Sequence, residues 1–407
     1  MSELETVEQR TQKLVAINGI FTPAAPITTK ELFSGRVDQL RTVLTGVSEP
    51  GRHIVVYGER GVGKTSLANI VSEILADRGH TVAKVTADTT DNFESLWRKL
   101  LQRVRISLPR NRAGFAGAVE ETLVSLDELL PRNVKPADIL RLFEKQESTL
   151  VLITDEYDRI CESTTKGLTA DTLKMLSDNK PDVTVILIGV ARNIGDLVGH
   201  HESIQRNLKQ VEMPRMSETE MGEIIEKGLK RLEMKMEGEP KKQIMKFAAG
   251  FPHYIHLLAN QSCRHAIERG STTVSREDFD FAVSEALDNA SESIRQAYQR
   301  ATIATKPTLY EPLLLACAEV KKDEHGTFRP TDLEPHVSRI VGRQVGVGSL
   351  MYPLAKLCSA ERGNILEKVG RARHYRYRFS DPLMEAYIRL KAHSATTLRS
   401  SATAESR

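Results

Sequence analysis

A glycine-rich segment at residues 58–65, with the sequence GERGVGKT, constrains the fold of this chain more than any other feature. It matches the pattern G-x-x-x-x-G-K-[ST], in which backbone N–H groups surround phosphate oxygens. A β-rich run at 53–57 precedes the segment, and a helical pattern at 66–75 follows it. This strand–loop–helix order predicts a P-loop, whose helix N-terminus adds partial positive charge beside the phosphates.

The P-loop predicts a site for ATP and Mg²⁺. Lys64 is expected to contact the outer phosphates, and the Thr65 hydroxyl is expected to ligate Mg²⁺. The alternative is a glycine-rich turn that binds no ligand, and the complete motif in its context argues against it. The predicted nucleotide-binding residues are Gly58, Glu59, Arg60, Gly61, Val62, Gly63, Lys64, Thr65 and Ser66.

Composition limits the classes of protein that fit. The 407 residues are 40% hydrophobic and carry a net charge of +3, so any contact with nucleic acid must come from local patches. The four cysteines lie far apart, without a C-x-x-C pair, which argues against a zinc site or a disulfide framework. The N-terminus is polar, and no apolar run is long enough to span a membrane. These features favour a cytoplasmic protein.

Hydrophobic patterns predict the fold class. β-rich runs alternate with helical material, and their nearly continuous apolar character predicts an α/β P-loop fold with a parallel sheet buried on both faces. The runs lie at 53–57, 81–87, 149–154 and 183–190, with a weaker one at 208–213. After Pro214 the pattern becomes helical, and from about residue 306 three helical runs precede two strand-like runs. The latter order is typical of a winged helix.

These patterns predict five segments. They are an N-terminal helix and linker at 1–29, a P-loop ATPase domain at 30–213, a helical lid at 214–305, a winged-helix domain at 306–393 and a disordered tail at 394–407.

An acidic pair follows the apolar run at 149–154. Asp155 is expected to hold Mg²⁺, and Glu156 to orient or deprotonate the attacking water. A polar strand end with no chemical role is the alternative, but the P-loop upstream favours the catalytic interpretation.

Two further residues are candidates for contact with the γ-phosphate. Asn193, with Arg192 as the alternative, follows the run at 183–190 and would lie beside the γ-phosphate. Arg206 precedes the last run and would reach the site of a neighbouring subunit as an arginine finger. An ordinary loop amide and a solvated arginine are the competing interpretations.

These motifs resemble those of AAA+ ATPases, and in particular the origin-recognition initiator-like, archaeal-type and STAND branches. The matching segments are LFSGR at 32–36 with Leu40, the P-loop, ITDEYD at 153–158, IGVARN at 188–193, MPRMS at 213–217 and GFPH at 250–253. The resemblance implies an ATPase that binds nucleotide between the sheet domain and the lid and forms a homo-oligomer in its ATP state.

One position departs from the initiator pattern. Initiator-type relatives carry a sensor arginine where this chain has His253, whereas the Gly-x-Pro at 250–252 resembles the STAND pattern. A phosphate contact by His253 and an ordinary core or surface histidine both stay open. His253 and His256 are three residues apart, but no third ligand is near enough in sequence to indicate a metal site.

Two basic stretches are candidates for nucleic-acid contact. The first spans 97–112, and the second is the predicted wing, where cations alternate with aromatics so that the two kinds face opposite sides of a strand. The predicted DNA-contacting residues are Arg371, Arg373, Arg376 and Arg378. The presumptive recognition helix at 349–356 has one cation and Pro353, which makes it a poor reader of bases.

The sequence therefore supports an ATP-dependent switch with competing outputs. In one, nucleotide state controls binding to duplex DNA through the winged helix. In another, a STAND-type signalling or defence ATPase contacts a separate effector protein through the same domain. A third is a regulator of a DNA transaction that works through a partner enzyme.

Overall fold

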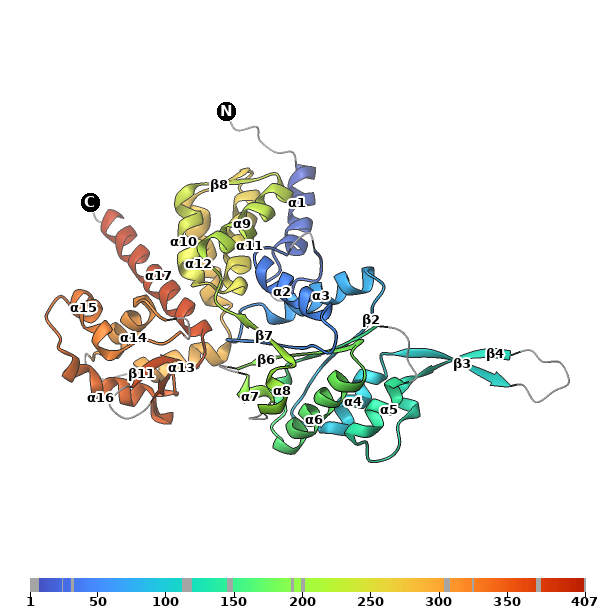
Figure 1. Ribbon diagram of the computed structural model, residues 1–407. Coiled ribbons are helices and arrows are strands. Elements are labelled where there is room, and N and C mark those ends of the chain that lie inside the picture. The colour runs from blue at the N-terminus through green and yellow to red at the C-terminus, as the bar shows by residue number, and fades with distance from the viewer. Residues whose placement is uncertain are drawn as a thin grey trace. The chain divides into compact units, whose positions relative to one another are not determined.

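The structure is a computed structural model of the chain (Figure 1). It describes residues 7–23, 25–30, 33–111, 119–144, 149–191, 194–198, 202–303, 308–323, 326–370 and 375–405. The chain forms two compact units. The sheet unit comprises Pro26–Glu59 and Gly63–Pro214, and the helical unit comprises Met1–Ala25, Arg60–Val62 and Arg215–Arg407.

The sheet unit is built on five parallel strands in the spatial order β2-β5-β6-β1-β7. They are β1 (His53–Gly58), β2 (Thr81–Thr86), β5 (Leu150–Asp155), β6 (Val183–Val190) and β7 (Leu208–Met213). The predicted α/β P-loop fold with a parallel sheet is confirmed, and its weak fifth run is a strand. Parallel pairing brings the carboxyl ends of β1, β5 and β6 to one end of the sheet, where P-loop proteins bind their ligands.

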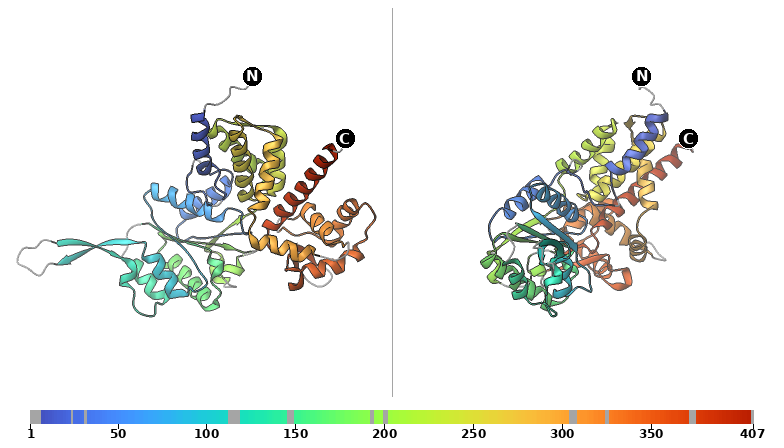
Figure 2. Two further views of the ribbon diagram at one scale, coloured as in Figure 1. Left: turned by 180° about the vertical axis from the view of Figure 1, so that it is seen from behind. Right: turned by 90° about the vertical axis from the view of Figure 1, so that its right-hand side faces the viewer.

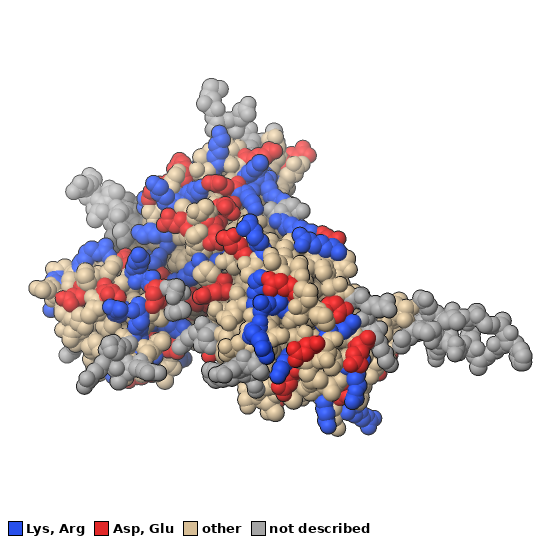
Figure 3. Space-filling view, viewed as in Figure 1, with Lys and Arg blue, Asp and Glu red and all other residues tan. Residues whose placement is uncertain are grey.

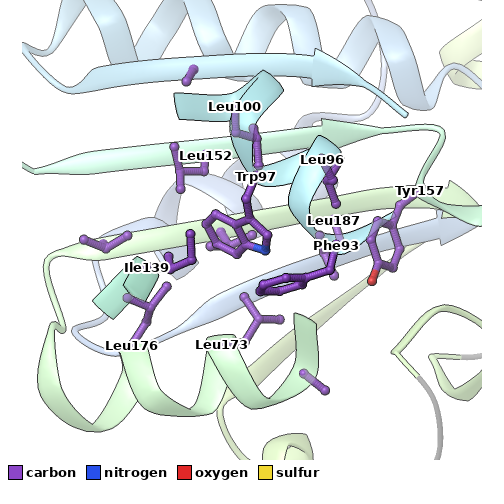
Figure 4. Packing of buried hydrophobic residues seen from close by; sticks show 14 of the residues in the cluster. Phe93, Leu96, Trp97, Leu100, Ile139, Leu152, Tyr157, Leu173, Leu176 and Leu187 are labelled. Carbon is purple, nitrogen blue, oxygen red and sulfur yellow. The ribbon is translucent and has the colours of Figure 1, made fainter. Parts of the chain in front are cut away.

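Helices cover both faces of this sheet (Figures 1 and 2). On one face lie α2 (Val37–Val47) and α3 (Lys64–Asp77), and on the other α4 (Phe93–Leu101), α5 (Pro136–Glu144) and α6 (Ser163–Asn179). The second face forms the core shown in Figure 4, where Trp97, 1% exposed, packs among leucines of α6 and β5. Short helices α7 (Gly195–Val198) and α8 (Glu202–Gln205) connect β6 to β7.

An antiparallel hairpin is inserted between α4 and α5. Strands β3 (Arg105–Asn111) and β4 (Val119–Ser125) pair only with each other, and in Figures 1 and 2 they extend away from the sheet. The sequence predicts helical material between 81–87 and 149–154, so this part of the prediction is wrong. Of the hairpin side chains that the structure describes, only Ile106, at the base, packs against the apolar core of the sheet unit, and no continuous apolar run marks the hairpin in the sequence.

The helical unit begins with α1 (Val7–Ile20) and continues with a helical bundle. The bundle consists of α9 (Glu218–Leu232), α10 (Gly238–Ala248), α11 (Pro252–Glu268), α12 (Arg276–Asp288) and α13 (Glu292–Thr302), with the short strands β8 (Lys235–Met236) and β9 (Thr273–Val274). A capping box is present at the start of α9, where the Ser217 hydroxyl accepts a hydrogen bond from the Glu220 N–H.

The C-terminal part of the helical unit, residues 308–405, has the element order expected from the sequence. Three helices precede a two-stranded antiparallel hairpin and a long last helix. They are α14 (Tyr310–Glu319), α15 (Pro330–Val341), α16 (Val347–Leu357), β10 (Leu366–Val369), β11 (Arg376–Phe379) and α17 (Leu383–Glu405). Residues 394–405, within the segment predicted as a disordered tail, continue α17 as helix, because they include no glycine or proline to end it.

The segment after α1 is folded onto the helical bundle, although its prolines predict an extended linker. Phe21 is 1% exposed and occupies the space above Gly228 of α9, where a Cβ atom would lie 2.1 Å from the phenyl ring. The Asn260 side chain donates a hydrogen bond to the Phe21 carbonyl at 2.9 Å. Because Gly228 has no side chain, Phe21 of the N-terminal segment can pack against α9 at this position.

A buried ionic cluster connects several elements of the helical unit. Glu385 of α17 is 2% exposed and pairs with Arg215 at 2.6 Å, with Lys322 at 2.9 Å and with Arg389 at 2.8 Å. The Arg215 guanidinium also lies over the Phe251 ring. Because Arg215 immediately follows the sheet unit in sequence, the cluster ties the start of the helical bundle to α17.

Within the described ranges, no helix combines the length and the apolar character needed to cross a bilayer.

Candidate nucleotide site

The P-loop has the backbone conformation that its glycines predict. Gly58, Gly61 and Gly63 have φ values of 155°, 84° and 97°, in the range that favours glycine. A Cβ atom on Gly58 would lie 2.4 Å from the Met213 carbonyl oxygen, so no larger residue fits there. Helix α3 begins at Lys64, directly after Gly63, which aims the N-terminus of a fourteen-residue helix at the loop.

Lys64 is a buried cation inside this loop. It is 8% exposed, and its ammonium donates hydrogen bonds to the carbonyls of Gly58 at 3.0 Å and Glu59 at 2.7 Å. Burial lowers the pKa of Lys64 to about 8, although the charges of Asp158 and Asp155 oppose the shift. The side chain is thus kept within the loop by bonds that a phosphate group can replace.

The acidic pair lies at the end of β5, as its position in the sequence predicts. Asp155 is 3% exposed, and its Oδ1 accepts a hydrogen bond from the Glu156 N–H at 2.9 Å. Glu156 has a φ of 53°, in the left-handed region, and its side chain is about half exposed. Asp155 is therefore a buried carboxylate held by a backbone hydrogen bond. The Glu156 side chain, in contrast, is half exposed and extends from a strained backbone position.

A lysine that sequence reasoning missed reaches the same carboxylate. Lys84 of β2 places its Nζ 4.0 Å from Asp155 Oδ2 and donates a hydrogen bond to the Asn69 side chain of α3. Burial lowers its pKa, against the attraction of Asp155. The pairing of β2 with β5 puts Lys84 there, and this pairing cannot be read from the lysine's own segment.

The end of β6 is held by the turn that follows β5. Asp158 accepts a hydrogen bond from the Val190 N–H at 2.7 Å, and its carboxylate lies 2.9 Å from the place of a Cβ atom on Gly189. This contact fixes the backbone just before the predicted γ-phosphate contacts. Asn193 and Arg192 themselves lie outside the described residues, so their roles stay predictions.

Arg206 is exposed in the turn before β7, and its carbonyl oxygen accepts a hydrogen bond from the Arg52 guanidinium. The exposed side chain is compatible with the arginine-finger prediction, which a single chain does not test.

The two histidines near the Gly-x-Pro segment contact the N-terminal segment. His253 Nδ1 lies 2.9 Å from the Pro23 carbonyl oxygen, and His256 Nδ1 accepts a hydrogen bond from the Thr22 N–H at 3.2 Å. Burial lowers the pKa of His256 to about 4, so the ring is neutral, as an acceptor must be. These contacts give both histidines a structural part in docking residues 21–23. Across the described residues no group of three metal-ligating side chains is found.

The predicted wing has the expected alternation of faces. Tyr377 and Phe379 are buried, and Arg376 and Arg378 are on the outer side of β11. Both arginines are paired within the domain, however: Arg376 with Asp323 at 3.0 Å and Arg378 with Glu367 at 2.6 Å. The other two predicted DNA contacts, Arg371 and Arg373, lie outside the described residues.

In the basic stretch at 97–112, two cations are paired within the chain. Arg98 bonds Glu94 at 2.8 Å, and Lys99 bonds Asp88 at 2.6 Å. Figure 3 shows basic and acidic side chains interspersed over the visible face. The described surface in that view therefore has no extended region of one charge.

Comparison with known proteins finds similarity to one domain family. Residues 47–197 match the family model described as an AAA domain. The Walker-type ATPase of Pyrococcus abyssi is similar in structure, with 16% identity, coverage of 90% of this chain and 99% of that chain, and a TM-score of 0.52. Cdc6p of Pyrobaculum aerophilum has 18% identity, covers 92% of this chain and 98% of its own, and has a TM-score of 0.45. No curated protein matched the chain.

The family match spans β1, the P-loop, the acidic pair and β6, which are the elements that form the site described above. The structural similarity to the Pyrococcus abyssi ATPase shows a shared fold. The part of the chain that carries the site is thus similar to an AAA domain.

Proposed function

We propose that the chain is an ATP-binding and ATP-hydrolysing switch. The observation that carries this proposal is the arrangement of Lys64, Asp155 and Glu156 after two strands of one parallel sheet, beside a P-loop in its glycine-dependent conformation. Burial lowers the pKa of Lys64 and the nearby charges of Asp155 and Glu156 act in the opposite direction, which supports a single site for the three groups. A cation for phosphates, a carboxylate for a metal and a second carboxylate for water are the groups that phosphoryl transfer to water requires.

The donor set fits a magnesium ion. Thr65 supplies a hydroxyl oxygen and Asp155 a buried carboxylate, and Mg²⁺ prefers oxygen ligands of these kinds together with phosphate oxygens. When bound, the ion neutralises charge on the phosphates. Lys64 would exchange its bonds to the loop carbonyls for bonds to the outer phosphates, and Glu156 would accept a proton from the attacking water.

Two substitutions test this function. We expect Lys64→Ala to abolish ATP binding, because it removes the cation from the loop, and Glu156→Gln to preserve binding while lowering turnover at least about 100-fold. Binding is measured with a fluorescent ATP analogue, and turnover by phosphate release. The exposed Lys174 on α6 offers a matched control, since Lys174→Ala should leave both unchanged. Normal turnover in the Glu156→Gln protein would show that another group activates the water.

For the output of the switch, the described residues favour contact with a protein partner through the C-terminal region. The ion pairs of Arg376 and Arg378 leave those cations less available for phosphates. Helix α16, at the place of a recognition helix, exposes Met351 and Tyr352, which are 40% and 67% exposed. An apolar, cation-poor face suits a protein surface better than a DNA groove.

DNA binding controlled by nucleotide is the second candidate, supported by the outward position of the β11 cations. Fluorescence anisotropy with a random-sequence duplex, ATP-loaded or ADP-loaded protein and two salt concentrations separates the two outputs. For a protein-directed switch we expect no nucleotide-dependent binding. Binding that depends on nucleotide, weakens steeply with salt and is lost when Arg371, Arg373, Arg376 and Arg378 become alanine would establish DNA as the target.

We also propose that the ATP state is a homo-oligomer in which Arg206 acts on a neighbouring subunit, the alternative being a solvated surface arginine. Its exposed position before β7 supports this, because a residue that acts on another chain must be accessible.

A further inference from the structure

The turn after β5 is fixed at several points. Tyr157 is fully buried, Asp158 is anchored to the Val190 N–H at 2.7 Å, and the Arg159 N–H donates to the Glu156 carbonyl at 2.9 Å. These contacts close the short 3₁₀ turn Tyr157–Arg159. The turn therefore presents the side chains of Glu156 and Arg159 from a rigid base.

On the exposed side of this turn, Arg159 holds the Glu156 carboxylate. Arg159 Nη1 lies 2.9 Å from Glu156 Oε2, and both side chains are about half exposed. Among the described residues, no other side chain donates a hydrogen bond to Glu156. The left-handed backbone at Glu156, with a φ of 53°, is costly for a residue other than glycine, and such conformations concentrate at functional sites.

We propose that Arg159 is a positioning residue that restrains the general base Glu156 and thereby limits the rate of ATP hydrolysis. This inference rests on the proposed ATPase function. During hydrolysis the water oxygen bonds to the γ-phosphorus, the bond from that phosphorus to the β–γ bridging oxygen breaks, and a proton of the water passes to Glu156. ADP and inorganic phosphate leave.

The geometry explains how the restraint acts. While Arg159 occupies Oε2, the carboxylate is held at the turn and one of its two oxygens is engaged, so it is not free to turn toward the attacking water. Because Arg159 contacts the proposed base, its removal should alter the rate of the chemical step. Because it does not belong to the P-loop, its removal should leave nucleotide affinity unchanged. Because the pair is half exposed, its strength depends on salt.

The test is the steady-state ATPase rate of Arg159→Ala as a function of ATP concentration. We expect kcat to rise about two- to five-fold with KM unchanged, a size set by the modest strength of exposed ion pairs. In the wild type, kcat should rise with salt, whereas in Arg159→Ala it should be insensitive to salt. Arg159→Lys should give an intermediate rate, because it keeps the charge with a less directional donor.

A matched control is Arg141→Ala on α5, which removes another exposed arginine of the sheet unit, paired with Asp138 at 3.3 Å. It should leave kcat and its salt dependence unchanged. An unchanged or lower kcat in Arg159→Ala would overturn the restraint, and so would a wild-type rate that salt does not raise, which can be measured even when a variant folds poorly.

The Glu156→Gln protein distinguishes failure of this inference from failure of the proposed function. If Glu156→Gln is inactive and Arg159→Ala is not faster, only the restraint is wrong. If Glu156→Gln hydrolyses ATP at the normal rate, the assignment of the base is wrong, and the restraint is wrong with it.

Discussion

A single buried carboxylate, Glu385, forms ion pairs with three cations of the helical unit. Burial opposes its ionisation, yet the charges of Lys322, Arg215 and Arg389 outweigh that effect and hold the pKa of Glu385 below its usual value. Lys322 is itself buried, so neither member of that pair can regain water if the other is removed. The cluster stabilises the helical unit only when all of its members are present, because removal of one residue leaves buried charges unpaired.

We therefore expect Glu385→Gln to destabilise the helical unit by about 3 kcal/mol, because it keeps the shape of the side chain and removes its charge. Urea unfolding followed by circular dichroism measures the change. The control is Glu361→Gln, which breaks an exposed pair with Lys356 and should cost no more than about 0.5 kcal/mol. Equal effects of the two substitutions would mean that the cluster is not stabilised by burial of its charges.

At the scale of single residues, the sequence predicts those parts of the site that a local motif defines. Lys64 and Asp155 can be placed because the P-loop and a buried strand end are recognisable within a few residues. Lys84 requires knowledge of strand pairing, so no reading of its own segment could assign it. Arg159 lies three residues after Glu156, and the turn between them brings the two side chains into contact. No distinctive sequence motif predicts that turn.

At the scale of elements, buried strands were predictable because a parallel sheet covered on both faces needs continuous apolar segments. The hairpin β3–β4 was not, because it lies outside the five-stranded sheet and carries no continuous apolar segment. The end of α17 was missed for a different reason. Its Ser/Thr/Ala-rich composition resembles a tail, but the buried residues Met384, Tyr387 and Ile388 nucleate a helix that can then propagate.

The segment after α1 shows the same limit on prediction. Its prolines indicate an extended conformation but cannot indicate what that conformation contacts. The contacts depend on Gly228, His256 and Asn260, more than 200 residues later in the chain. Tertiary packing thus turns an expected linker into a docked part of the helical unit.

At the scale of the whole molecule, each unit contains a buried neutral histidine that makes it sensitive to acid. In the sheet unit, His53 is fully buried, donates from Nε2 to the Leu173 carbonyl at 2.8 Å and accepts from the Val185 N–H at Nδ1, at 3.0 Å. Burial lowers its pKa to about 4, as it does for His256 in the helical unit. In both cases the acceptor nitrogen must stay unprotonated for its hydrogen bond to form.

These shifts predict how stability depends on pH. In the unfolded chain both histidines bind a proton near pH 6.5, whereas in the folded protein they stay neutral to about pH 4. Their stabilisation is therefore complete above pH 6.5 and is lost as the pH falls from 6.5 toward 4. At pH 5 each of the two histidines should lower the free energy of unfolding by about 2 kcal/mol relative to neutral pH.

Urea unfolding at pH 7.5 and pH 5, monitored separately for each unit by hydrogen exchange, checks this prediction. His53→Gln should lower the stability of the sheet unit at pH 7.5 but reduce its loss on acidification by about 2 kcal/mol, while the helical unit keeps its own loss. His80→Gln, at a partly exposed histidine of the sheet unit, is the control and should retain the wild-type difference. Replacement of His53 removes the proton that it binds on unfolding, so it must reduce the loss of stability between pH 7.5 and pH 5 if His53 causes that loss. An unchanged loss in His53→Gln would show that other groups cause the acid sensitivity of the sheet unit.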